Sequence, residues 1–166
     1  MPSPSDVEGW LAGLGITPLE RADREGIVSW DLVLDGRRRF DVRITLILDP
    51  SIALIAWVHY APPIGDGLRR AYRQFLLWND EFPFAKFSLA EDGRPALTAE
   101  MPVENADEDS LGLALARLLL ICDRLLDQSA GWIWLGGRTP AGDARLSRGV
   151  RLIERFGDRL AELQPA

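Results

Sequence analysis

FDVRITLIL, the sequence of residues 40–48, shows the clearest alternation of apolar and polar side chains in the chain. Because successive side chains of a strand point to opposite faces, this period of two predicts a long strand with one buried face. The polar parity carries one exception, Ile47, beside Asp41, Arg43 and Thr45. The expected buried face consists of Phe40, Val42, Ile44, Leu46 and Leu48. A half-buried strand of this kind is typical of an antiparallel sheet.

Two further strands are predicted beside this one. Residues 27–34 place their apolar side chains on one parity, and Asp35-Gly36 is a strong signal for a two-residue hairpin turn. Residues 52–60 are apolar on both parities, which is expected of a strand in mid-sheet with both faces covered. The simplest arrangement is an antiparallel meander of three strands.

One helix is predicted before this meander in the sequence, and another is predicted after it. Ser5 and Glu8 form a possible capping box for a first helix over about 5–14. Asp66 can cap an amphipathic helix that ends before Pro83.

The remaining sequence adds a hairpin and two more helices. Short alternating stretches at 85–89 and 97–101 predict the hairpin, and Asp107 caps a long helix that reaches about Asp127. A last helix is expected over 147–163. The element order is then α-β-β-β-α-β-β-α plus a C-terminal helix, which is an α+β fold.

The long helix after Asp107 is apolar on nearly its whole circumference. Leu113, Leu120 and Ile121 lie off its main apolar stripe. Such a helix must be covered on most sides, either by the C-terminal segment or by a second subunit. A homodimer is the favoured explanation, with these three residues as candidate interface residues.

Bulk composition favours a single domain. The 166 residues are 47% hydrophobic and 27% charged, with a formal net charge of −6, so we expect one domain over 1–166. Its core spans about 5–128, and an extension over about 131–166 packs on it. The negative charge opposes binding to nucleic acid or anionic lipid, and no apolar run is long enough for a membrane span. We expect a cytoplasmic protein with no nucleic acid or membrane partner.

The sequence contains no recognisable catalytic, cofactor-binding or metal-binding set. His59 is the single histidine, and Cys122 is the single cysteine on an apolar stripe, so both are interpreted as structural. The glycines at 131, 136 and 137 fit no phosphate-binding motif. The acidic group at the start of the long helix is explained by capping and the helix dipole; it comprises Glu104, Asp107, Glu108 and Asp109. We therefore expect no enzyme and no cofactor.

Two groups of arginines also have structural interpretations. Arg37, Arg38 and Arg39 discourage pairing between sheet edges. Arg148, Arg151, Arg155 and Arg159 share a helix face. Glu154, Asp158 and Glu162 are spaced along that helix for ordinary ion pairs, which predicts a solvated face.

Several short stretches across residues 5–128 form a recognisable set: Trp30-Asp31-Leu32, Leu76-Leu77-Trp78-Asn79, Lys86-Phe87-Ser88-Leu89 with Asp92-Gly93, and Met101-Pro102 leading to Ala114 through Asp123. In these stretches the chain resembles the YbjN family, which shares its fold with the chaperones of type III secretion. The resemblance implies a small α+β domain with a strongly curved antiparallel sheet, often dimeric, whose relatives either bind peptide segments of other proteins or are only loosely described as regulators. It implies no catalytic residues.

The candidate partner-binding residues are apolar side chains that either the core or a partner protein could bury. Val33, Ile47, Ile55 and Trp57 lie on strand parities that should face away from the main core. Trp132 and Trp134 pose the same question, because aromatic side chains suit both contact surfaces and core closure. If helices cover both faces of the sheet, all of these residues are structural. If they do not, these residues form a partner surface.

These observations predict a non-enzymatic, dimeric binding module that holds apolar segments of partner proteins. The alternative function is a small-molecule-sensing or regulatory domain with a pocket between sheet and helix. A third possibility is a structural dimer whose apolar surface is used entirely in self-association.

Overall fold

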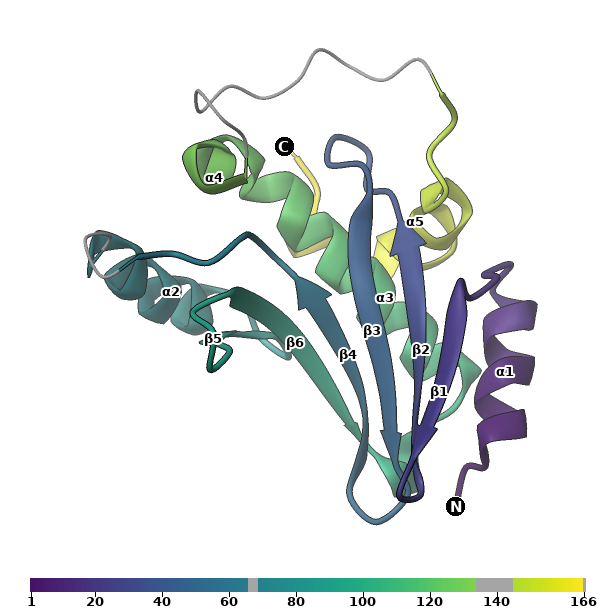
Figure 1. The fold of residues 1–166 in the computed structure, drawn as a ribbon. Coiled ribbons are helices and arrows are strands. Elements are labelled where there is room, and N and C mark those ends of the chain that lie inside the picture. Colours follow the sequence, from purple (N-terminus) through teal and green to yellow (C-terminus); the bar gives the residue numbers. More distant parts are fainter. Residues whose placement is uncertain (66–68, 134–144, 166) are drawn as a thin grey trace.

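The computed structural model describes residues 1–65, 69–133 and 145–165, and it shows an α+β fold built on one antiparallel sheet (Figure 1). Six strands in the order β1-β2-β3-β4-β6-β5 form this sheet in the described part of the chain. They are β1 (Glu20–Arg24), β2 (Ile27–Leu34), β3 (Val42–Asp49), β4 (Ala53–His59), β5 (Lys86–Leu89) and β6 (Pro95–Pro102). The sheet is open, and its two edge strands are β1 and β5.

Helices cover one face of the sheet. They are α1 (Pro4–Gly13), α2 (Arg69–Glu81), α3 (Glu108–Arg124), α4 (Leu126–Ile133) and α5 (Val150–Phe156), with short 3-10 helices η2 (Val103–Asn105) and η3 (Gly157–Leu163). In Figure 1, α3 and α5 lie behind the sheet, α1 lies near β1, and α2 lies beside β5. Leu32, Leu46 and Leu54, on the parities predicted as buried, face this helical layer and are almost fully buried. Phe40 is an exception, because it precedes β3 and is only half-buried.

The meander has four strands rather than the predicted three. β1 has the sequence ERADR, which lacks apolar alternation, so the period of two could not reveal it. It pairs with β2 through a tight turn at Glu25-Gly26, where both residues have positive φ (54° and 83°). This φ combination is that of a type I′ hairpin turn.

The predicted two-residue turn at Asp35-Gly36 is wrong. The chain leaves β2 after Leu34 and enters β3 only at Val42, so residues 35–41 form a seven-residue connection, here called the β2–β3 loop. Its backbone is held by Asp123, whose carboxylate accepts hydrogen bonds from the backbone N–H groups of Arg37, Arg38 and Arg39 at 2.7, 2.9 and 2.8 Å. A contact from α3, more than 80 residues away, therefore sets the turn conformation.

The helix caps partly follow prediction. Asp107 caps α3 as expected, and its side chain accepts a hydrogen bond from the Ser110 backbone N–H at 2.8 Å. The first helix begins earlier than expected, because its capping box uses Ser3 and Asp6 rather than Ser5 and Glu8.

The C-terminal segment supplies the cover that α3 needs. Leu120 and Ile121 are 3% and 0% exposed within a single chain, and α5 and η3 both pack on α3. These two residues were predicted as dimer-interface residues, but that assignment is wrong because the same chain already buries them. Leu113, the third candidate, is half-buried.

The arginines of the C-terminal segment pair with other elements rather than with their own helix. Arg155 lies 3.1 Å from Glu108, and Arg159 lies 2.6 Å from Asp109. These contacts correct the expected intrahelical ion pairs, and they join the C-terminal segment to the start of α3.

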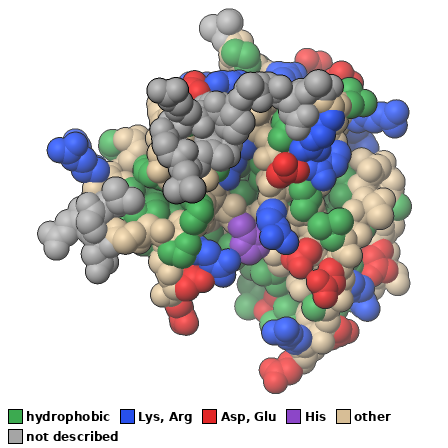
Figure 2. Space-filling view, turned by 45° about the horizontal axis from the view of Figure 1, so that its top comes forward, with side chains coloured by type: hydrophobic (Ala, Val, Ile, Leu, Met, Phe, Trp, Pro, Cys, Tyr) green, Lys and Arg blue, Asp and Glu red, His purple; other side chains and the backbone are tan. Residues whose placement is uncertain are grey.

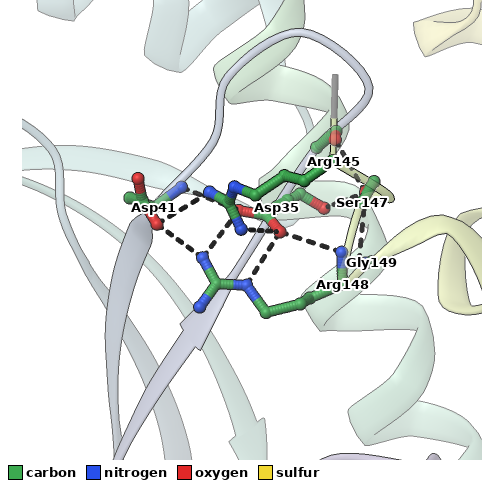
Figure 3. A network of polar contacts seen from close by, with 7 residues as sticks. Asp35, Asp41, Arg145, Ser147, Arg148 and Gly149 are labelled. Carbon is green, nitrogen blue, oxygen red and sulfur yellow. Dashed lines mark hydrogen bonds and ion pairs between the residues drawn. The ribbon is translucent and has the colours of Figure 1, made fainter. Parts of the chain in front are cut away.

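A second charge network ties the same segment to the β2–β3 loop (Figure 3). Asp35 is fully buried and accepts hydrogen bonds from the backbone and side chain of Arg148 at 2.8 to 2.9 Å. Arg145 also contacts Asp35, at 3.2 Å, and both arginines reach Asp41. A Cβ at Gly149 would collide with the Asp35 carbonyl oxygen, so glycine permits this close approach.

The environment of Asp35 keeps its carboxylate ionised. Burial alone would raise the pKa of Asp35, but hydrogen bonds from the side chain and backbone of Arg148 and from the backbone of Asp41 outweigh burial. The pKa of Asp35 therefore falls well below its ordinary value. Its stabilising contribution is present above the pKa of an unfolded Asp, about 3.9, and is lost as pH falls through the lower pKa of the folded state.

We predict that Asp35→Asn lowers the free energy of unfolding at pH 7 by about 2 to 3 kcal/mol, because it removes the charge of a buried carboxylate that accepts hydrogen bonds from two partly exposed arginines. Urea unfolding monitored by circular dichroism measures this change. Asp158→Asn makes the same chemical change at an exposed position and should alter stability by less than about 0.5 kcal/mol. Equal effects of the two substitutions would contradict this account of the network.

Candidate functional site on the open face of the sheet

The face of the sheet opposite α3 is the candidate site. It points toward the viewer in Figure 1, and none of the helices in the described ranges crosses it. Four predicted partner-binding residues, Val33, Ile47, Ile55 and Trp57, lie on this face with partly exposed side chains. The alternative prediction was a sheet packed by helices on both faces. In the described ranges, no helix covers these four positions.

Strand register brings three of these four residues together. Ile47 pairs directly with Ile55, and Trp57, two residues further along β4, pairs with Thr45. Ile47, Ile55 and Trp57 therefore form one apolar area, here called the open-face patch. Val33 pairs instead with Arg43, at the polar end of the same face.

A hollow of about 300 Å³ lies at this polar end. Its polar lining comprises Asp31, Arg43, Thr45, His59 and Arg94, and its apolar lining includes Val33 and Leu19. Figure 2 shows the histidine, in purple, inside a depression with basic side chains, in blue, close to it. The open face thus joins an apolar patch to a polar hollow.

A chain of hydrogen bonds crosses three strands inside this hollow. The Thr45 hydroxyl donates to the Asp31 carboxylate at 2.9 Å, and its oxygen lies 2.8 Å from Nε2 of His59. A hydroxyl has one hydrogen, and an ionised carboxylate can only accept. The hydroxyl oxygen must therefore accept from His59, which places a proton on Nε2.

This arrangement is not that of an activated nucleophile. In such sites the histidine takes the hydroxyl proton, whereas here His59 donates to Thr45 and Asp31 holds the Thr45 proton. The hydrogen bonds instead fix the three side chains in place. No group of three or more His, Cys, Asp or Glu residues in the described ranges is arranged to hold a metal.

The hollow disfavours the protonated form of His59. Partial burial lowers the pKa of His59, the nearby Arg94 and Arg43 guanidinium groups lower it further, and Asp31 opposes them. The pKa therefore lies below the ordinary value of about 6.5. At neutral pH the positive charge of the hollow comes from Arg43 and Arg94.

The two predicted tryptophans of the C-terminal extension fall outside this face. Trp132, on α4, contacts Phe75 and Trp78 of α2 with ring centroids 5.3 and 5.6 Å apart. It belongs to an aromatic cluster that joins α4 to α2, which gives it a packing role. Trp134 lies outside the described residues.

The polar residues of the hollow were not predicted as a site. Asp31, Arg43 and Thr45 could have been found from the sequence, because correct strand parity and register put them side by side. Arg94 could not, because it comes from the β5–β6 connection, far along the chain.

Comparison with known proteins shows the family of this chain. The family model YbjN, described as "putative bacterial sensory transduction regulator", matches residues 3–130. The chain belongs to the YbjN family. The YbjN match includes the whole open face but ends before Arg145 and Arg148, so the charge network that holds the β2–β3 loop uses residues beyond it. No curated protein matches the chain.

Across the described parts of the chain, every helix is too short or too polar to cross a membrane.

We predict that His59 titrates below pH 6.5 and that Arg94→Gln raises its pKa, because the substitution removes a nearby positive charge. NMR titration of the single imidazole measures both values. Arg151→Gln removes a charge from α5, on the helical side of the sheet, and should leave the His59 pKa unchanged. A His59 pKa at or above 6.5 in the unmodified protein would refute the prediction.

Proposed function

We propose that the chain is a non-enzymatic binding module that holds apolar segments of partner proteins on the open face of its sheet. The observation that carries this proposal is the open-face patch of Ile47, Ile55 and Trp57, which lies partly exposed on a face that no described helix crosses. A rigid sheet presenting adjacent apolar groups can bind without a large ordering cost.

The chemistry of the face indicates what kind of segment binds. Apolar side chains of the partner pack on the open-face patch, and an acidic residue beside them lies near Arg43 and Arg94 in the hollow. Arg94 is already paired with Asp92 at 2.6 Å, whereas no ion pair of Arg43 is found among the described residues, so Arg43 suits this role better. The expected partner is an apolar segment with a neighbouring Asp or Glu.

Self-association is a separate part of the proposal. Because Leu120 and Ile121 are buried within the chain, a homodimer must use other apolar surface. Leu76 and Leu77 on α2 and Phe84 just after it are 71%, 51% and 81% exposed. We propose that this area of α2 mediates a homodimer, which would leave the opposite part of the sheet accessible.

We predict a native mass close to twice the 18.5 kDa of one chain. Light scattering coupled to gel filtration measures it, and Leu76→Ser with Leu77→Ser should shift the mass toward one chain because it removes apolar contact area. A monomeric native protein would refute the dimer but not the binding function.

We predict that the unmodified protein binds a permanently unfolded model protein, reduced carboxymethylated α-lactalbumin. Ile47→Thr with Ile55→Thr should weaken this binding about tenfold or more, because it removes apolar area worth roughly 1.4 kcal/mol or more. Threonine keeps the branched Cβ that suits a strand, so the sheet should remain folded. Fluorescence anisotropy of the labelled model protein measures the affinity.

The matched control is Ile52→Thr, the same chemical change at a side chain 67% exposed in the β3–β4 turn. It should bind like the unmodified protein. Equal affinity for all three proteins, with circular dichroism showing each to be folded, would reject the open face as the binding surface.

A further inference from the structure

A cavity of about 550 Å³ lies away from the open face, where the β2–β3 loop, the end of α3 and the C-terminal residues 163–165 meet. Its volume is within the range of about 300 to 1,000 Å³ that is usual for small-molecule sites. Leu120, Leu163 and Pro165 provide apolar lining. Arg37, Arg38 and Arg124 provide basic lining, so the cavity has two chemically distinct parts.

The acidic groups near this cavity are already engaged. The Asp123 carboxylate accepts three backbone N–H groups of the β2–β3 loop. Asp127 pairs with Arg38 at 2.9 Å, and Glu81 lies 3.8 Å from Arg124. Arg37 donates to the neutral side-chain amide oxygen of Gln164, so its positive charge is not balanced by that partner.

With Asp127 and Glu81 included, three guanidinium groups stand beside three carboxylates, so what distinguishes this region is a lining rich in guanidinium groups rather than a net positive charge. Three guanidinium groups line one cavity together with one carboxylate, and that carboxylate is already satisfied by the loop backbone. Guanidinium groups bind carboxylate and phosphate groups through paired hydrogen bonds. The adjoining leucines and proline would exclude water from the body of such a ligand.

We propose that this cavity binds a small amphiphile with an anionic headgroup and an apolar body. Arg37 and Arg124 hold the headgroup, and Leu120 and Leu163 contact the apolar body. The proposal does not depend on the function proposed for the open face, because the two sites share no residue.

Binding at this place would act on the connections that hold the C-terminal segment. The β2–β3 loop contributes Arg37 and Arg38 to the cavity and Asp35 to the charge network with Arg148. A ligand that contacts both the loop and residues 163–165 joins the two segments at a second point. It should therefore raise the stability of the folded protein by mass action.

The test uses decanoate, below its micelle concentration, as the probe. Decanoate should raise the thermal unfolding midpoint in a concentration-dependent way and shift the backbone NMR signals of Arg37, Arg38 and Arg39. Decanol has the same apolar length but no charge and should bind at least about tenfold more weakly, because it lacks the charged hydrogen bond.

Variants locate the binding. Arg37→Gln and Arg124→Gln should each weaken decanoate binding about tenfold, because each removes a charged hydrogen bond. Arg151→Gln is the matched control and should leave decanoate binding unchanged. Ile47→Thr with Ile55→Thr should also leave decanoate binding unchanged. A loss in this open-face variant, with Arg37→Gln and Arg124→Gln unaffected, would overturn the proposal without affecting the open-face function.

A vesicle experiment distinguishes binding of a free amphiphile from binding of a membrane lipid. Vesicles of phosphatidylglycerol present an anionic headgroup whose apolar chains stay in the bilayer. Binding of decanoate without sedimentation on these vesicles supports the proposal. Sedimentation on the vesicles without decanoate binding overturns it, and so does the absence of both.

Discussion

The carboxylate of Asp123 is the constraint on which the arrangement of the C-terminal half depends. It accepts the backbone N–H groups of three successive residues in the β2–β3 loop, and it is itself almost fully buried on α3. A buried carboxylate without partners would be very costly, so α3 and the loop must stay together. Gly36 adds to this requirement, because any Cβ there would collide with the Asp123 side chain.

The loop conformation then directs its charged residues to different neighbours. Arg37 and Arg38 point to the cavity beside the C-terminal residues, whereas Arg39 is only 6% exposed and lies over the Tyr60 ring at 4.6 Å. Arg39 also donates to the Tyr60 carbonyl oxygen. Asp35, at the start of the loop, contacts Arg148 of the C-terminal segment instead. One short connection therefore joins the sheet, α3 and the C-terminal segment, which a two-residue turn could not do.

The parts of this fold that were predictable are those decided by local patterns. Alternation identified β2 and β3, and capping identified the start of α3, because side-chain parity and cap hydrogen bonds are properties of neighbouring residues. β1 was missed because it is exposed at the sheet edge, where no apolar period is needed. The β2–β3 loop was mistaken for a tight turn because Asp35-Gly36 satisfies the local rule, while Asp123 and Arg148 decide the structure from far along the chain. The open-face patch was predictable from parity alone, but the hollow beside it required the register of three strands and one residue from a distant loop.

The internal hydrogen bonding of the hollow also decides which of its groups can act on a partner. Asp31 is occupied by the Thr45 hydroxyl, and Thr45 is occupied by His59 on its other side. These hydrogen bonds hold the three side chains to one another, and the remaining acceptor positions of the exposed Asp31 carboxylate face solvent. Arg43 is the exception, because its charge faces the hollow without a carboxylate partner in the described residues. The face therefore offers an apolar patch and one cation whose desolvation has to be compensated by the partner. Under the proposed binding function, a purely apolar segment covering the whole face would leave that cation unsatisfied, so a segment with its own acidic group is the expected partner.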